Sequence, residues 1–197
     1  MESEMQTDYF VIESAANSAH PLLQWDEEAL EFRRPEPVVR SEPVRLVLGS
    51  PVPRNPMMVD HHSLPQPVFS ARIKEALEPL GLHGVQFVPA DVKVTPADVR
   101  RYWVLHVYNE IRCLDRQQSV CSFYSDGDVL SIEKLVLDER VLGELPLERR
   151  RLFVLAETLS TYVVHHSLVE RLLGLTPPPE GIRVVRVDRW NDSAGFQ

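Results

Sequence analysis

Histidine, serine and cysteine side chains are the groups in this sequence that could do chemistry. A small hydrolase or transferase could use His106, Asp115 and Ser119, with His106 as the base, because a hydroxyl nucleophile needs a base within hydrogen-bond reach. No GxSxG nucleophile motif is present. A single histidine amid apolar residues is more typical of a hydrogen-bonded core residue. We therefore expect no catalytic residues and a protein that is not an enzyme.

The other histidines and the two cysteines do not form a metal-binding pattern. Cys113 and Cys121 lie eight residues apart without a CxxC motif, and their apolar neighbours favour a structural role. His61–His62 and His165–His166 are adjacent pairs, and neighbouring side chains of an extended chain point in opposite directions. The scattered glycines form no phosphate-binding loop. We expect neither a metal nor another cofactor.

The net charge of −8 is concentrated near the N-terminus. Residues 1–32 hold eight of the 29 acidic residues and none of the 21 lysines and arginines, so the rest of the chain is balanced. One interpretation is a solvated, solubilising segment. The other is an acidic docking face for a basic partner, with an aromatic anchor. The residues of that face would be Trp25, Asp26, Glu27, Glu28 and Glu31.

Composition limits the class of protein further. The acidic N-terminal segment would repel nucleic acid and anionic membranes, so we expect no partner of either kind. No stretch approaches the roughly 18 to 20 apolar residues of a membrane span, and the N-terminal residues do not resemble a signal peptide. Two cysteines are too few for a secreted disulfide framework. These features favour a soluble cytoplasmic protein, and they are compatible with a homo-oligomer.

Three stretches can be distinguished, which we expect to form one domain. Residues 1–34 are acidic and contain a short strand at residues 9–12. Residues 35–67 hold eight of the 16 prolines, which favours an extended segment that wraps over the core, with an edge strand at residues 44–48. Residues 68–197 form the main α+β core.

A strand–helix–glycine–strand unit occurs twice in this core. The first copy spans residues 68–89 and the second spans residues 162–187. Each copy begins its helix after a serine, so we expect Ser70 to cap the first helix and Ser167 to form a capping box with Glu170. We expect both helices to pack on the same sheet.

Strand-like sequence separates the two copies. Residues 102–108 are β-branched and aromatic, as in a central strand. Residues 120–124 and 129–137 follow as a hairpin around Asp126–Gly127, which extends the pattern to a meander. The fold class is therefore α+β, with a mainly antiparallel sheet and two or more short flanking helices.

The order of these motifs resembles a bacterial family that was first catalogued as a domain of unknown function. That family was later assigned to the immunity proteins of polymorphic toxin systems. The matching motifs cover nearly the whole chain, and they are patterns of strand, serine and glycine rather than a set of reactive groups. Their structural positions are Ser70, Gly84, Asp115, Ser119 and Gly181. The chain departs from the family pattern in its proline-rich stretch and in the run of three prolines at residues 177–179.

The resemblance implies a non-enzymatic cytoplasmic protein that binds and neutralises a cognate toxin. An interaction protein of another class is the alternative, namely a regulatory inhibitor or chaperone-like partner of a secreted protease or effector. In that case residues 35–67 would lie extended in the partner's cleft.

Overall fold

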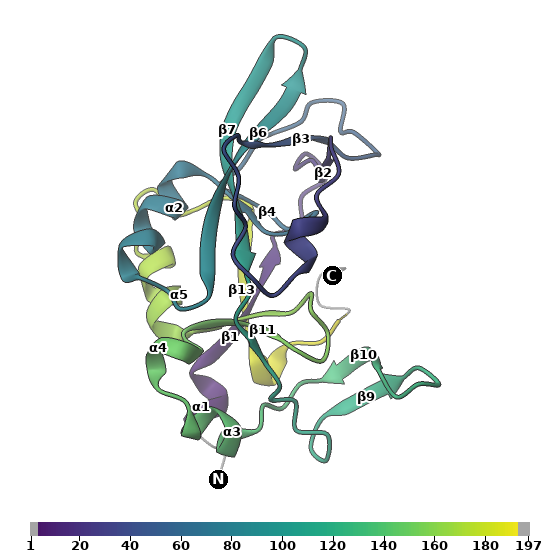
Figure 1. The fold of residues 1–197 in the computed structure, drawn as a ribbon, viewed down its shortest axis with the longest axis vertical. Helices are drawn as coiled ribbons and strands as arrows, with labels where there is room; N and C mark the ends of the chain where they lie inside the picture. Colours follow the sequence, from purple (N-terminus) through teal and green to yellow (C-terminus); the bar gives the residue numbers. More distant parts are fainter. Residues whose placement is uncertain (1–3, 193–197) are drawn as a thin grey trace.

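Two β-sheets and a separate hairpin contain the strands of residues 4–192, the part of the chain described by the structure, a computed structural model (Figure 1). The first sheet has six strands in the order β2-β3-β6-β7-β5-β4. Its strands are β2 (Leu23–Trp25), β3 (Val44–Leu48), β4 (His61–His62), β5 (Val68–Phe69), β6 (Val85–Thr95) and β7 (Asp98–Val107). The acidic segment (β2) and the proline-rich segment (β3 and β4) thus supply strands to the sheet that contains β7, which covers most of the predicted central strand.

The second sheet has five strands in the order β13-β1-β12-β11-β8. Its strands are β1 (Tyr9–Ser14), β8 (Glu110–Ile111), β11 (Leu152–Leu155), β12 (Tyr162–His165) and β13 (Ile182–Arg186). Only β3–β6 and β8–β11 pair in parallel among the described strands. The predicted α+β class with largely antiparallel pairing is confirmed.

The helices are short. They are α1 (Glu4–Thr7), α2 (Ala71–Leu77), α3 (Glu139–Glu144), α4 (Leu147–Arg150) and α5 (His166–Leu173), with 3-10 turns η1 (Leu30–Arg33), η2 (Glu78–Leu80) and η3 (Val187–Arg189). Asp138 caps α3 by accepting hydrogen bonds from the backbone N–H groups of Arg140 and Val141. No helix among the described residues is long and apolar enough to cross a membrane.

The predicted repeat has a structural counterpart in two split β-α-β units. In the first unit β5 and β6 are parallel, and β7 lies between them, antiparallel to both. In the second unit β12 and β13 are parallel, and β1 lies between them in the same way. The expectation that both helices belong to one sheet was wrong, because each unit builds its own sheet. Helix α2 contacts β5 and β7 of the first sheet, and α5 contacts β1 and β12 of the second; the two helices contact each other and share one apolar core.

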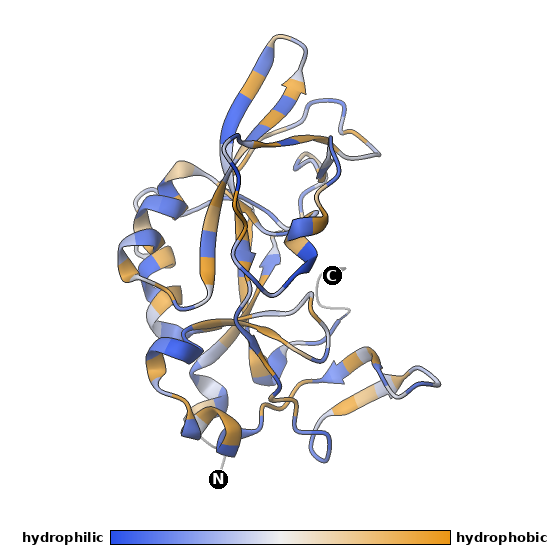
Figure 2. Ribbon diagram, in the orientation of Figure 1, coloured by the Kyte–Doolittle hydropathy of each residue, from blue (hydrophilic) through white to orange (hydrophobic). Residues whose placement is uncertain are grey.

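Three apolar cores follow from the alternation of side chains along the strands. In β1, Tyr9 and Val11 point into one core, whereas Phe10 and Ile12 point into the core beneath α2 and α5. The third core lies on the far face of the six-stranded sheet, where it is covered by the segment between β2 and β3. Figure 2 shows the corresponding alternation of apolar and polar residues along β6 and β7.

The proline-rich segment contributes strands and buried side chains to the first sheet. The strand at residues 44–48 exists as β3, but it is not an edge strand, because β2 and β6 pair with its two sides. Val38, His61 and His62 are buried. The amide of Gln86 pairs with both the N–H and the C=O of Val38, which ties the start of the segment to β6.

Both predicted serine caps were wrong. Ser70 precedes α2, but its hydroxyl makes no capping bond and donates instead to Asp60 Oδ1 at 2.6 Å. Helix α5 begins two residues before the expected point, and its N-cap is His165, whose Nδ1 accepts the N–H of Ser167. The Ser70 hydroxyl is thus used as a donor to Asp60, and at α5 the His165 imidazole takes the place of Ser167 as the capping acceptor.

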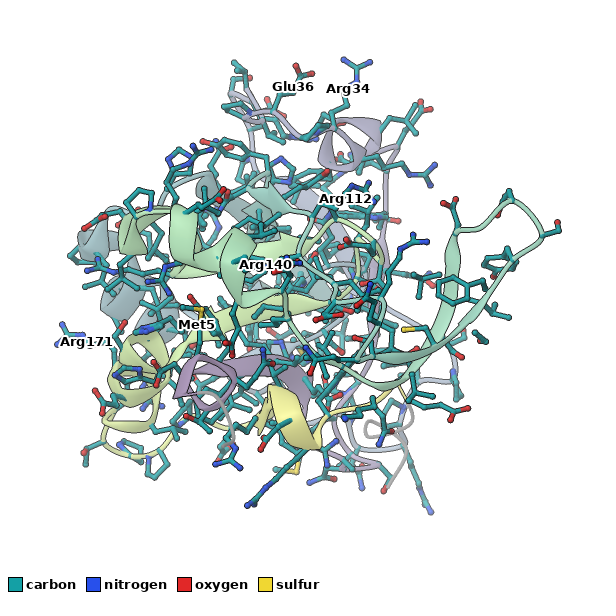
Figure 3. The ribbon with its side chains drawn as sticks, turned by 90° about the horizontal axis from the view of Figure 1, so that it is seen from below. Met5, Arg34, Glu36, Arg112, Arg140 and Arg171 are labelled. Atoms are coloured by element: carbon teal, nitrogen blue, oxygen red, sulfur yellow. The ribbon has the colours of Figure 1, made fainter. Side chains whose placement is uncertain are left out.

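The hairpin of β9 (Val120–Phe123) and β10 (Val129–Lys134) is present, as Asp126–Gly127 predicted, and Gly127 has a φ of 90°. The predicted meander is wrong, since these strands pair with each other in a sheet of two. The hairpin projects from the body of the molecule (Figures 1 and 3). Ile132 belongs to the first core, and the half-buried Cys121 and Val129 pack against it, which attaches the hairpin to the body.

Candidate functional site

The five predicted docking residues lie around the end of β2 and the turn that follows it. Trp25 is half-buried and stacks on the ring of Phe32, with ring centroids 4.9 Å apart. Asp26 and Glu28 are exposed. Trp25 is therefore partly committed to the fold, whereas these two carboxylates are open to a partner.

Glu27 and Glu31 are neutralised by arginines of the proline-rich segment. Arg40 forms ion pairs with both, at 2.5 Å to Glu31, and Arg45 of β3 lies 3.1 Å from Glu27. The Glu27 side chain is only 15% exposed. The structure thus separates the predicted acidic face into two exposed carboxylates and two that hold residues 26–45 together.

The structure does not assemble His106, Asp115 and Ser119 into one site. His106 lies in β7, where its Nε2 is 2.8 Å from the carbonyl oxygen of Glu36 and its ring packs edge-on against Phe32. No side-chain hydrogen bond joins His106 to the other two within the described chain. His106 thus attaches the proline-rich segment to the first sheet.

Asp115 and Ser119 instead fix the turn that leads into the β9–β10 hairpin. Asp115 Oδ1 accepts the N–H groups of Gln117 and Gln118. The Ser119 hydroxyl donates to the carbonyl of Val136 and accepts its N–H, at 3.1 and 3.0 Å. The Ser119 side chain therefore bonds to the backbone of Val136 as a neighbouring strand would, and it joins the two ends of the hairpin.

The sequence did not predict the buried carboxylate of Asp60 and its three hydrogen bonds. Asp60 is 9% exposed, and it accepts hydrogen bonds from the Ser70 hydroxyl, the Arg72 guanidinium and the Glu180 N–H. These three partners come from both split units, so one carboxylate joins the proline-rich segment to each of them. Its sequence neighbours offered no signal, since an aspartate before two histidines in a proline-rich stretch is typical of a loop.

Asp8, His165 and His166 form a cluster whose ligand atoms lie within 4.8 Å of one another. This overturns the argument that adjacent histidines must diverge, because the helix begins between these two residues and their rings lie 4.2 Å apart. The cluster is poorly suited to a cation. The lone pair of His165 Nδ1 already accepts the Ser167 N–H, and Arg150 and Arg151 add positive charge.

The projecting hairpin exposes a set of large apolar side chains. Their exposed fractions lie between 44% and 56%: Val120, Phe123, Tyr124 and Leu130. Register shifts on either side of Leu130 and Glu133 mark bulges, which explain why the apolar pattern does not follow a strict alternation. Apolar groups gathered on one projecting element are typical of a protein contact surface.

Comparison with known families decides what kind of protein carries these features. The profile of the immunity protein family Imm11 matches residues 8–187. The chain belongs to the Imm11 family. No curated protein matches the sequence. The Imm11 match spans both split units, the proline-rich segment and the hairpin, so all the sites described above lie within it.

Membership of Imm11 implies a role in toxin neutralisation and a toxin as partner, and immunity proteins are typically non-enzymatic. Both cysteines of this Imm11 chain are free thiols and Cys113 is buried. Burial raises the pKa of each above its ordinary value, which disfavours the reactive thiolate.

Proposed function

We propose that this Imm11 protein neutralises its cognate toxin by binding it and covering its functional surface, without chemistry of its own. The family match supports the toxin as the partner. The dispersal of His106, Asp115 and Ser119 to separate structural roles supports inhibition by occlusion.

The observation that carries the proposal is the apolar surface of the β9–β10 hairpin. Aromatic residues dominate the binding energy of protein interfaces, and Phe123 and Tyr124 stand exposed on an element that projects from the body (Figure 3). The guanidinium of Arg116 lies 5.4 Å from the Phe123 ring and keeps it oriented. Aromatic and arginine side chains together are the usual composition of an interface centre.

The acidic residues of the N-terminal segment have a secondary place in this proposal. The predicted face lies at one end of the six-stranded sheet and consists of Trp25, Asp26, Glu27, Glu28 and Glu31. Of its four carboxylates, those of Glu27 and Glu31 pair with Arg40, whereas those of Asp26 and Glu28 are exposed. These two would accelerate the approach of a basic toxin by long-range attraction, whereas the hairpin would supply the contact energy.

The experiment begins with affinity purification of the tagged protein from its native cell and identification of the bound protein by mass spectrometry. The purified partner is then assayed for toxicity or enzymatic activity with and without this protein. We expect stoichiometric quenching. A partner whose activity is unchanged by saturating amounts of this protein would overturn the proposal.

Matched variants then locate the interface. Phe123→Ser together with Tyr124→Ser should weaken toxin binding at least tenfold, with little change in melting temperature because both side chains are exposed. Leu173→Ser on α5 is the control, since Leu173 is equally exposed but lies on another element. Equal affinities for the two variants would exclude the hairpin as the contact surface.

A further inference from the structure

A cleft lies between the tip of the β9–β10 hairpin and the loop that follows β11. Its volume is about 470 Å³. Charged groups line it from both sides: Arg112, Arg116, Asp126, Asp128 and Glu157. The exposed side chains of Tyr124 and Leu159 form apolar parts of its wall. In Figure 3, Arg112 lies on the side of the body from which the hairpin projects.

Glu157 is the unusual member of this set because its side chain is only 3% exposed. Its Oε1 accepts the backbone N–H of Leu114 at 3.3 Å, but its Oε2 is buried and has no hydrogen-bond partner. Arg112 approaches only to 4.0 Å, and its own side chain is 71% exposed. A buried carboxylate oxygen without a donor is destabilising, so the free protein holds an acceptor that a ligand could satisfy.

We propose that this cleft receives a cationic side chain of the toxin, with Glu157 as its buried acceptor. This inference rests on the proposed function and names one contact of that complex. Asp126 and Asp128 attract the cation at the rim, and Tyr124 and Leu159 contact its aliphatic stem. Arginine suits this lining best, because its planar guanidinium presents several N–H donors and can bind more than one carboxylate.

Charge and geometry favour a cation over the other classes of group. The cleft has three carboxylates against two guanidiniums, and one of those, Arg116, lies against the ring of Phe123. An anion would meet the buried Glu157 carboxylate directly. Arg112 is exposed enough to move outward, so the incoming cation would replace a long ion pair with a close one.

The backbone beside Glu157 supports the same conclusion. Leu159 has a φ of 41°, in the left-handed region that a leucine rarely adopts, and it is 58% exposed. The N–H groups of Thr158 and Leu159 both bond to the carbonyl of Leu155, which holds the loop in this form. An exposed apolar side chain kept in a strained conformation is typical of a binding loop rather than of a packing position.

A probe experiment tests the cleft independently of any toxin. N-acetyl-arginine methylamide is titrated into ¹⁵N-labelled full-length protein, and amide chemical shifts are followed. We expect saturable shifts at residues 112–116, 124–128 and 156–159, and none with the neutral citrulline analogue. Equal shifts with the citrulline analogue, or none at these residues with the arginine probe, would overturn the proposal.

Two variants should change the binding of the arginine probe in opposite directions. Glu157→Gln should abolish the shifts, while its remaining side-chain oxygen can still accept the Leu114 N–H and preserve the fold. Arg112→Gln should strengthen probe binding by several-fold, because it removes the competing cation. A merely structural role of Glu157 would not predict the second effect, and weaker binding to Arg112→Gln would contradict the proposal.

The identified toxin supplies the final test. Glu157→Gln should weaken its binding at least tenfold and flatten the salt dependence of affinity, whereas Glu75→Gln on the exposed side of α2 should change neither. If the toxin is quenched equally well by Glu157→Gln and the unaltered protein, the cleft is not a docking site and the proposed function stands. If no toxin is quenched, the proposed function fails, and the probe titration still reports on the cleft.

Discussion

Gly84 and Gly181 occupy equivalent positions in the two split β-α-β units. Each directly precedes the strand that follows the helix, β6 or β13, and each has a positive φ, of 63° and 78°. The carbonyl of Gly84 accepts the N–H groups of Tyr108 and Asn109 just past the end of β7, and the carbonyl of Gly181 accepts the N–H of Ala15 just past the end of β1. In each unit, therefore, the same kind of hydrogen bond joins the start of the strand after the helix (β6 or β13) to the end of the middle strand (β7 or β1).

Alanine at either glycine should destabilise the protein by about 2 kcal/mol or more, from left-handed backbone strain and from overpacking. A Cβ at Gly84 would lie 2.5 Å from Asn109 Cβ, and a Cβ at Gly181 would lie 2.6 Å from the carbonyl oxygen of His61. Urea denaturation of each variant measures the loss. Gly81→Ala is the control, because Gly81 has a φ of 57° but nothing within 4 Å of its Cβ. If Gly81→Ala is as destabilising as the other two, close packing is not the cause.

Asp60→Asn should lower the free energy of unfolding by about 2 kcal/mol, since hydrogen bonds to a charged acceptor contribute about 1.5–3 kcal/mol each and some are retained by the amide. Asp60 accepts from Ser70, Arg72 and Glu180. Ser70→Ala removes one of these donors, so a double-mutant cycle should give a coupling energy between the two positions. Strict additivity of the two single changes would contradict the direct bond.

Stability should fall as the pH drops from about 6.5 to 4. Burial lowers the pKa of His61 from 6.5 to about 4, and it also lowers the pKa values of His62 and His165. Between these pH values the unfolded chain binds a proton at His61 that the native protein excludes, so unfolding becomes easier by up to about 1.4 kcal/mol per pH unit for this residue. The lowered pKa values of His62 and His165 act in the same direction. Denaturation at pH 7, 5.5 and 4 measures this slope. His61→Gln should make the slope shallower, because it removes the group with the most strongly lowered pKa.

Asp26→Asn with Glu28→Gln should slow association with the toxin several-fold at low salt and reduce the salt dependence of the rate, while the dissociation rate stays nearly constant. Stopped-flow binding at two ionic strengths measures both rates. Glu27→Gln serves as the comparison, because Glu27 pairs with Arg40 and Arg45 and should affect stability first. An association rate that does not respond to loss of the two exposed charges would remove this face from the proposal.

Local signals in the sequence predicted much of the fold. The Asp126–Gly127 hairpin and the strands at residues 9–12 and 102–108 all appear, because each depends on the turn chemistry or the β-propensity of neighbouring residues. The first copy of the repeat ends at residue 89, so its last strand was predicted too short. Pro89 lies within β6, which runs on to Thr95 and pairs with β7 along its length.

Long-range partners account for what the sequence could not predict. The charge count predicted Glu27 on an exposed acidic face, but Glu27 pairs with Arg40. Arg40 belongs to the proline-rich segment, which was predicted to be a stretch of its own. Ser70 was expected to accept an N–H of its own helix, yet its hydroxyl instead donates to the distant carboxylate of Asp60. The cleft at Glu157 depends on a side chain whose burial no local pattern indicates.

The place of β1 in the second sheet has a consequence for synthesis of the protein. The first split unit is contiguous, so β5, α2, β6 and β7 can associate as soon as they leave the ribosome. Of the described strands β1 is the first in the chain, but its two partners, β12 and β13, are the last two. During translation β1 must therefore wait with both edges unpaired, which makes the nascent N-terminal segment the part of this chain most dependent on protection from aggregation.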